Sequence, residues 1–285
     1  METFEKNKIN GSTLYLVGTP IGNLADISER AKKTLREVDF IAAEDTRNSM
    51  KLCSCLGIKK EFVSYHEHNK KQSGEKIIAR LLSGESCALV TDAGMPAISD
   101  PGEDLVRLAA EAGITVTVIP GACAAVSALA LSALSTSRFC FEGFLPVQKS
   151  ERKKRLDSLL SEVRTMIFYE APHKLKCTLS DMASAFGEDR KISLCRELTK
   201  LNEEIIRTTL GEAVRLYNEK EPRGEYVLIL EGKEATEDKN AELSALSPSE
   251  HVEHYTNLGL SKMDAIKSAA KDRGISKSEM YKLLI

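Results

Sequence analysis

The fold class of this chain is decided by the stretch Cys87-Ala88-Leu89-Val90-Thr91-Asp92-Ala93-Gly94-Met95-Pro96-Ala97-Ile98-Ser99-Asp100-Pro101-Gly102. Its first four residues are apolar and predict a buried strand, and a helix-like segment follows from Glu103 to Ala112. The loop between them holds two glycines, two prolines and two aspartates. Open α/β folds bind ligands at the carboxyl ends of buried strands, so this loop predicts a ligand site.

Strand and helix patterns alternate on both sides of this stretch. In the first part of the chain, apolar β-rich runs predict strands at residues 13–17, 38–43, 61–65 and 115–119. A second block of the same kind predicts strands at residues 139–144, 165–169, 191–195, 204–209 and 226–230. Short apolar strands that alternate with helices are typical of largely parallel sheets. We therefore expect an α/β fold with two α/β subdomains, mainly parallel or mixed sheets, and a small helical domain at the end.

Composition shifts along the chain predict the domain boundaries. The amino-terminal α/β subdomain is expected at residues 1–134 and the second at 135–232, with a cleft between them. A polar, acidic stretch at 233–246 is typical of a linker, and a helical tail is expected at 247–285.

Two helices of the α/β part are predicted from local signals. One is expected to begin at Asp26, with Glu29 three residues on as its capping partner. The other is a run of small apolar residues from Ala122 to Leu134, which is expected to form a buried helix.

The tail carries repeated helix-start signals. Ser247 and Glu250 form a capping pair, and so do Ser276 and Glu279, while Gly274 is expected to end the helix before the last one. Two short helices joined by such a turn resemble a helix-turn-helix, and a small helical cap on the main body is an equal alternative.

Composition limits the class of protein. The 285 residues carry a net charge of −2, and no apolar run approaches the length of a membrane span. Seven cysteines without regular spacing, and an amino terminus without a secretion pattern, predict a cytoplasmic protein with reduced thiols and no membrane partner. The basic cluster at residues 149–155 can attract phosphates, although a solvated helix face is the commoner meaning of such a run.

Four glycine-bearing loops lie at or beside strand ends, at residues 18–23, 92–102, 120–122 and 223–225. None matches a dinucleotide or ATP motif. Glycine lets a backbone approach a ligand closely, so four such loops together predict a ligand cleft.

Longer motifs carry a resemblance to a known family. The chain resembles the bacterial small-subunit ribosomal RNA (cytidine-2′-O)-methyltransferases, which belong to the tetrapyrrole methylase superfamily. The similarity runs in order from about Ser12 to Leu230 and extends over the basic tail. It rests on the segments 16–24, 43–47, 65–69, 90–102, 119–121, 141–146, 168–173 and 195–200.

The resemblance implies S-adenosylmethionine as cofactor, bound between the two subdomains. By motif position the cofactor-binding residues are Pro20, Ala93, Gly94, Met95, Ile98, Ser99, Ala122, Cys123, Glu170, Leu198, Tyr226 and Val227. Met95 departs from the related tetrapyrrole enzymes, which have an aspartate there, and Cys123 stands where small hydroxyl residues are common.

A ribose hydroxyl becomes a good nucleophile only when a group accepts its proton. The candidates are Glu44, Asp45, His66 and His68, together with Asp100 and Glu197. On a strand, His66 and His68 would share one face, and a third metal ligand is not evident, so we expect no metal. Asp45 could instead brace its loop by pairing with Arg47.

Basic residues suited to RNA phosphates are Arg47, Lys153, Lys154, Lys174, Arg196 and Lys200. The resemblance implies a cytidine in the decoding region of 16S ribosomal RNA, on the assembled small subunit, as the substrate. It also implies a homodimer, and the apolar-rich strand segment at residues 139–145 is a candidate interface. We expect no DNA partner. Two alternatives remain: a tetrapyrrole methyltransferase of the same fold, and a non-catalytic RNA-binding protein of ribosome assembly.

Overall fold

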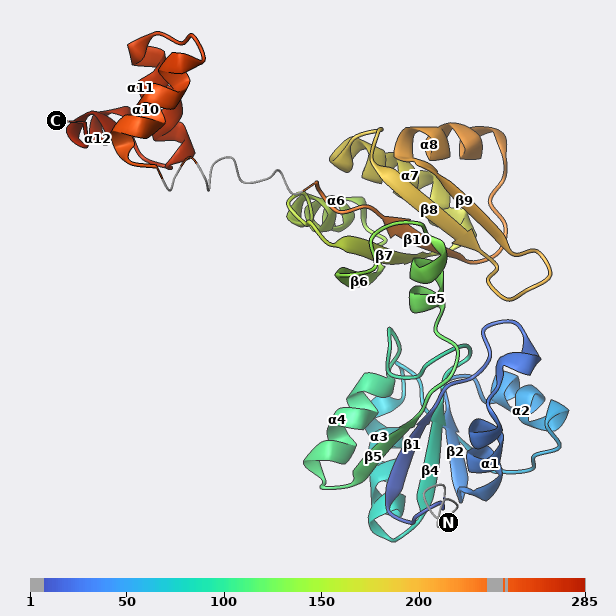
Figure 1. The fold of residues 1–285 in the computed structure, drawn as a ribbon. Helices are drawn as coiled ribbons and strands as arrows, with labels where there is room; N and C mark the ends of the chain where they lie inside the picture. Colours follow the sequence, from blue (N-terminus) through green and yellow to red (C-terminus); the bar gives the residue numbers. More distant parts are fainter. Residues whose placement is uncertain (1–7, 235–242, 244–245, 285) are drawn as a thin grey trace, which may run out of the picture. The chain divides into compact units, whose positions relative to one another are not determined.

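The computed structural model describes residues 8–234, 243 and 246–284. The chain divides into two compact units, Met1–Gly232 and Lys233–Ile285 (Figure 1). Most of the predicted linker at 233–246 lies outside the described residues. No helix in the described parts of the chain combines the length and apolar character that crossing a membrane requires.

The first sheet of the larger unit is entirely parallel. Its spatial order is β3-β2-β4-β1-β5, and each neighbouring pair is parallel. The central strand β4 is buried at every residue, as its apolar sequence predicts for a strand covered on both faces. The strands are β1 (Thr13–Val17), β2 (Phe40–Ala43), β3 (Glu61–Ser64), β4 (Ser86–Val90) and β5 (Thr115–Ile119).

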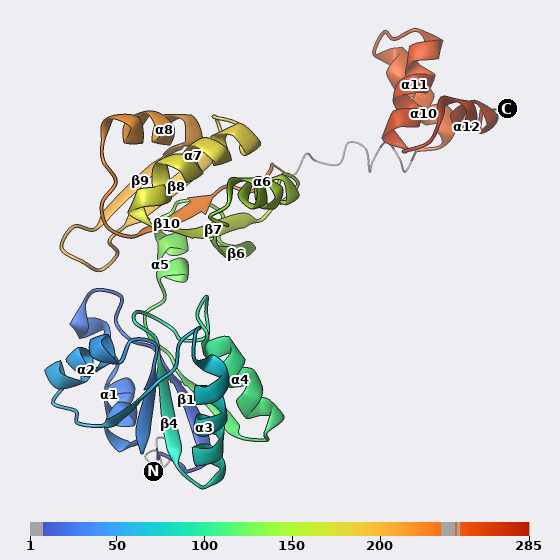
Figure 2. The same ribbon diagram turned by 180° about the vertical axis from the view of Figure 1, so that it is seen from behind.

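Helices cover both faces of this sheet (Figures 1 and 2). Helices α1 (Glu29–Glu37) and α2 (Thr46–Cys55) share one hydrophobic core with it. Helices α3 (Lys70–Leu82) and α4 (Gly102–Glu111) share a separate core with it. The arrangement is a doubly wound α/β half, in which the carboxyl ends of the strands form one edge.

The predicted start of α1 at Asp26 is wrong. Residues Leu24–Asp26 form a short 3-10 turn, η2, in which the amide of Ala25 donates to the side chain of Asn23. The α-helix begins at Glu29, because the hydroxyl of Ser28 accepts the backbone N–H of Ala31. Glu29 therefore occupies the first turn rather than the capping position three residues in.

The second sheet is mixed. Its order is β6-β7-β10-β8-β9, and only the pair β6–β7 is parallel. Helices α6 (Lys149–Ser158), α7 (Pro172–Phe186) and α8 (Leu210–Glu219) pack on one face. The strands are β6 (Phe139–Phe144), β7 (Thr165–Glu170), β8 (Lys191–Arg196), β9 (Glu204–Thr209) and β10 (Tyr226–Leu230). The expected α/β fold with parallel and mixed sheets is confirmed.

Helix α5 (Ala124–Leu131) packs on the opposite face of this sheet. Ala125, Ala128 and Leu129 are buried there, but Val126 and Leu131 are exposed. The buried helix predicted over residues 122–134 is therefore confirmed only in part, because the helix spans Ala124–Leu131 and buries one of its sides. The sheet covers one face of the helix, and the opposite face, with Val126 and Leu131, points away from this sheet.

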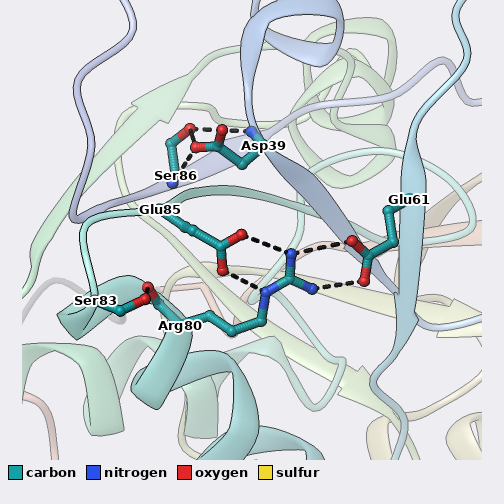
Figure 3. Close-up of polar contacts among 6 residues, drawn as sticks. All are labelled: Asp39, Glu61, Arg80, Ser83, Glu85 and Ser86. Atoms are coloured by element: carbon teal, nitrogen blue, oxygen red, sulfur yellow. Dashed lines mark hydrogen bonds and ion pairs between the residues drawn. The ribbon is translucent and has the colours of Figure 1, made fainter.

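Polar side chains lock the amino ends of the first sheet (Figure 3). Arg80 donates to Glu61 (2.7 Å) and to Glu85 (2.5 Å), and its guanidinium lies 3.7 Å from the centroid of the Phe40 ring. Nearby, Ser86 donates from its amide and its hydroxyl to Asp39, each at 2.7 Å, and these bonds lower the pKa of that carboxyl. These groups satisfy one another at the edge of the sheet opposite to the carboxyl ends of its strands.

In the smaller unit, the described residues from 246 to 284 include the helices α10 (Pro248–Asn257), α11 (Lys262–Asp272) and α12 (Lys277–Lys282). Both predicted capping boxes, Ser247 with Glu250 and Ser276 with Glu279, are confirmed. The helices share a core of their own, formed by Val252, Ala265, Ile266, Ala269, Ala270 and Met280. Gly274 has a φ of +66° in the turn after α11, which a glycine adopts without strain.

Candidate functional site

A cavity of about 640 Å³ lies at the carboxyl ends of strands from both sheets of the larger unit. From the first sheet it is lined by the segments that follow β1, β2 and β4. From the second sheet it is lined by the ends of β6, β7 and β8 and by the start of β10. The lining residues are Ile21, Glu44, Thr91–Ala93, Ile98–Asp100, Ala124, Phe144, Tyr169–His173, Cys195, Glu197, Leu198, Lys200 and Glu225–Val227.

Two of the glycine loops meet one another beside this cavity. A Cβ on Gly18 would lie 2.6 Å from the Cα of Gly121, and a Cβ on Gly121 would lie 2.8 Å from the Gly18 backbone. Thr19 and Gly94 exchange backbone hydrogen bonds of 2.9 and 3.2 Å in an isolated bridge. These glycines allow three loops to pack together, and neither Gly18 nor Gly121 lines the cavity.

The loop after β4 is held in a strained conformation. Ala97 and Ser99 have φ values of +68° and +61°, which non-glycine residues rarely adopt. The carboxylate of Asp100 fixes the loop by accepting the amides of Ala97 (3.0 Å) and Gly102 (2.7 Å). Burial raises the pKa of Asp100. Strain that the surroundings enforce in this way is concentrated at functional sites.

The loop after β8 is strained in a similar way. Glu197 and Thr199 have φ values of +51° and +65°. Glu197 accepts the Glu225 amide (3.0 Å) and the Lys200 ammonium (2.9 Å), and Lys200 lowers the pKa of Glu197. The same ammonium donates to the Glu225 carboxylate at 2.8 Å. Lys200 is therefore neutralised inside the cavity wall, although the sequence suggested it as a phosphate contact.

Glu170, at the end of β7, is buried. Its carboxylate accepts the Thr178 hydroxyl at 2.5 Å and the Ala171 amide at 2.8 Å. Proline at the start of α7 fixes the chain just beyond it. The carboxylate is thus rigidly placed on the cavity wall.

Two of the candidate proton acceptors, Glu44 and Asp45, are neighbours in the chain but lie in different environments. Glu44 lines the cavity and accepts the Thr91 hydroxyl at 3.0 Å, and burial raises its pKa. Asp45 does not line the cavity and caps α2, accepting the amide (2.8 Å) and Nε (3.0 Å) of Arg47. Arg47 lowers the pKa of Asp45 to about 2. This geometry supports loop bracing for the Asp45–Arg47 pair.

His66 and His68 lie in the segment after β3, not on the strand, which ends at Ser64. Their ring centroids are 6.0 Å apart, and neither ring lines the cavity. The backbone amide of His66 donates to the Asn69 side chain at 2.8 Å. No group of three potential metal ligands is found among the residues that the structure describes.

An aromatic side chain sits at the edge of the cavity. Phe144 is 57% exposed, and its ring centroid lies 5.5 Å from that of Tyr169. A bulge between Phe141 and Gly143 changes the register of β6 just before it, with Gly143 at a φ of +63°. Bulges re-aim the side chains that follow them, so the end of β6 presents Phe144 to the cavity.

Seven of the twelve residues suggested for the cofactor line the cavity: Ala93, Ile98, Ser99, Glu170, Leu198, Tyr226 and Val227. The other five are Pro20, Gly94, Met95, Ala122 and Cys123, which belong to the loops after β1, β4 and β5 or to the start of α5. Sequence reasoning did not assign Thr91, Asp92, Phe144, Tyr169 or Glu225 to the cavity wall. Four of them lie within the motif segments 90–102, 141–146 and 168–173, and Glu225 lies in the glycine loop 223–225, so these positions at strand ends were the available signal.

The basic residues suggested for RNA divide into two groups. Arg47, Arg196 and Lys200 each form an ion pair within the protein, with Asp45, Glu204 and Glu197 respectively. Lys153, Lys154 and Lys174 have no ion-pair partner among the described residues. Within the cluster at 149–155, Arg152 is 7% exposed and donates to Asp181 at 2.7 Å, so it anchors α6 to α7.

The cavity is rich in acidic groups. Its wall holds one lysine, Lys200, and one histidine, His173. A site of this charge attracts cations and repels phosphates. The carboxylates in its wall are Glu44, Asp92, Asp100, Glu170, Glu197 and Glu225.

Comparison with known proteins identifies relatives of both sequence and fold. Residues 13–214 match the family of Tetrapyrrole (Corrin/Porphyrin) Methylases. The Ribosomal RNA small subunit methyltransferase I of Halalkalibacterium halodurans is 52% identical, covering 95% of this chain and 94% of its own. The protein of that name from Bacillus subtilis is 50% identical, covering 94% and 92%. Among solved structures, diphthine synthase superposes with a TM-score of 0.60 at 14% identity, over 78% of this chain and 90% of its own.

Proposed function

Because this chain belongs to the tetrapyrrole methylase family, among the small-subunit ribosomal RNA methyltransferases I, we propose that it methylates the 2′-hydroxyl of a cytidine in 16S ribosomal RNA. The chain is an S-adenosylmethionine-dependent ribosomal RNA methyltransferase. The observation that carries the proposal is the 52% identity to such an enzyme over 95% of the chain. The position in the decoding region and the assembled small subunit as substrate belong to the same proposal.

The cavity suits S-adenosylmethionine in size and charge. Its volume of about 640 Å³ falls within the range of small-molecule sites. Ile98, Leu198 and Val227 provide apolar wall for the adenine, and the buried carboxylate of Glu170 is fixed nearby. The surrounding carboxylates favour the positively charged sulfonium and ammonium groups of the cofactor. When bound, the cofactor supplies the methyl group for transfer.

Among the candidates for the proton acceptor, Glu44 is the best placed. It lines the cavity, and its raised pKa makes it a stronger base than Asp45, whose pKa Arg47 lowers to about 2. A base is most effective when its pKa approaches the working pH. We assign Glu44 to accept the ribose proton, and Thr91 to orient the Glu44 carboxylate.

Phe144 fits the role of a surface for the target base. A ribose hydroxyl in folded RNA reaches a cavity only when its nucleotide is turned out of the stack. Unstacked bases are commonly held on aromatic side chains. Phe144 is exposed at the cavity edge, and Tyr169 packs behind it.

The proposal includes a homodimer, with residues 139–145 as the candidate interface. Phe139 at the start of β6 is 42% exposed, and β6 is an edge strand of its sheet. Exposed apolar edge strands pair readily with another chain. Sedimentation of the purified protein tests this part independently of activity.

The test of the activity is transfer of labelled methyl from S-adenosylmethionine to small ribosomal subunits that lack the modification. Naked 16S RNA and a tetrapyrrole serve as parallel substrates. We expect label in subunit RNA, recovered after alkaline hydrolysis as a resistant dinucleotide that contains cytidine, because a 2′-O-methyl group blocks cleavage. Label in the base, in another nucleoside or only in the tetrapyrrole would contradict the proposal.

A further inference from the structure

The helical unit carries a groove whose chemistry differs from that of the cavity. It is open, with a volume of about 500 Å³, and lies where the start of α11 meets α12. Its lining includes two lysines and no carboxylate. The lining residues are Met263, Lys277, Ser278, Tyr281 and Lys282.

The lysines of the helical unit, including Lys277 and Lys282 in the groove lining, are available to bind a partner. None of the five in residues 246–284 has an ion-pair partner among the described residues. The unit's carboxylates are mostly engaged in its own structure: Glu250 and Glu279 complete capping boxes, Asp264 accepts the Ser261 hydroxyl, and Asp272 accepts the Tyr255 hydroxyl. The five lysines are Lys262, Lys267, Lys271, Lys277 and Lys282.

Apolar surface accompanies this charge. Tyr281 is 49% exposed and Met263 is 54% exposed, although the unit has a core of its own to bury such residues. The arrangement of α11, a four-residue turn with Gly274, and α12 matches a helix-turn-helix, whose second helix presents its side chains to nucleic acid. An exposed tyrosine flanked by lysines suits a strand of nucleic acid, with phosphates on the cations and a base on the ring.

We propose that this groove binds a strand of ribosomal RNA outside the methylated nucleotide, with Lys277 and Lys282 on phosphates and Tyr281 stacked on an unpaired base. The proposal rests on the RNA substrate assigned above. Charge complementarity selects this partner, because the cavity repels the phosphates that the groove attracts. Recognition of the folded substrate is thereby separated from the site of methyl transfer.

The test measures binding of the full-length protein to a fluorescein-labelled RNA hairpin by fluorescence anisotropy at several salt concentrations. The variant K277E/K282E is expected to bind at least about tenfold more weakly, with the salt slope reduced by about 0.7 for each phosphate that the variant no longer neutralises. Y281A is expected to bind about tenfold more weakly, and Y281F to keep most of the affinity. All variants are expected to bind S-adenosylmethionine as the native protein does.

Two controls separate the groove from general charge and from misfolding. K59E/K76E makes the same change in charge at two exposed lysines of the larger unit, away from the cavity lining, and should leave RNA affinity within about twofold. K277R/K282R keeps the groove charge and should bind like the native protein.

Unchanged RNA affinity and salt slope in both K277E/K282E and Y281A would overturn the proposal. Weaker binding to intact subunits with unchanged binding to the hairpin would overturn it too, since the groove would then dock on a ribosomal protein. Tighter binding of a DNA hairpin than of the RNA hairpin would exclude RNA as the preferred partner. A native protein that binds the hairpin through the groove but never labels ribosomal RNA would instead contradict the proposed function.

Discussion

The cavity of the larger unit and the groove of the helical unit have opposite chemistry. The cavity wall contains six carboxylates, and its lysine, Lys200, is paired with Glu197 and Glu225. The groove contains two lysines without ion-pair partners among the described residues and no carboxylate in its lining. A site of one charge cannot favour both the sulfonium cation of the cofactor and the phosphodiester backbone of RNA. The comparison suggests that this protein assigns the cation and the anion to separate units.

The largest effect is expected from E44Q, which tests the chemistry of the cavity. Removal of a general base lowers kcat by about 10²–10⁴-fold, while affinity for RNA stays the same because the groove is untouched. Glu44 must be unprotonated to accept a proton, so native kcat should fall as the pH drops through its pKa, which burial raises above the usual glutamate value. Single-turnover rates across pH should show that E44Q lacks this acidic decline.

The matched control for E44Q is D45N, which removes a neighbouring carboxylate that Arg47 already holds ionised. A smaller fall in kcat, with no change in the acidic decline, is expected of D45N. An unchanged kcat in E44Q would show that the acidic cavity contributes no proton acceptor at this position.

Ending the chain after Gly232 removes the groove and keeps the cavity. Affinity for the RNA hairpin should fall about 10- to 100-fold, because the phosphate-binding lysines and the stacking tyrosine are removed together. Calorimetry should give the native dissociation constant for S-adenosylmethionine, and thermal unfolding should confirm an intact α/β unit. A weaker affinity of the shortened protein for S-adenosylmethionine would contradict the assignment of cofactor binding to the larger unit alone.

F144A is expected to raise the KM for subunits about tenfold, the usual cost of removing one aromatic stacking partner. Because Phe144 carries no charge, the dependence of KM on salt should not change, in contrast to the groove variants. F144Y preserves the ring and should behave like the native protein. A change in sedimentation of F144A would assign the residue to the dimer interface instead.

The smallest effect is expected from K153A/K154A on α6. These lysines are exposed, and their removal should weaken RNA binding by about two- to fivefold and slightly reduce the salt slope. Arg152, in the same cluster, is a poor choice for this test because it is buried against Asp181. An effect as large as that of K277E/K282E would show that α6, rather than the groove, is the main site of phosphate binding.

The sequence predicted the secondary-structure elements better than it predicted which side chains are free to contact a ligand. The α/β pattern and the two capping boxes of the helical unit follow from local residue types and appear where expected, whereas the capping pair predicted at Asp26 and Glu29 does not. The contacts of Gly18, Gly121 and Arg152 could not be predicted because their surroundings come from segments distant in sequence. From the amino-acid sequence alone, a glycine that lets another backbone approach cannot be distinguished from a glycine that lets a ligand approach. The raised pKa of Glu44 and the lowered pKa of Asp45 likewise depend on burial and on pairing.

The close approach of Gly18 to Gly121 affects how amino-acid substitutions at these two positions should be interpreted. Selection against any side chain at either position would act through protein abundance and loop geometry, not through chemistry. Changes there would therefore resemble catalytic lesions in a genetic screen, although no reacting group had been altered. Measuring the soluble yield and the cofactor affinity of each variant, rather than its turnover alone, distinguishes the two causes.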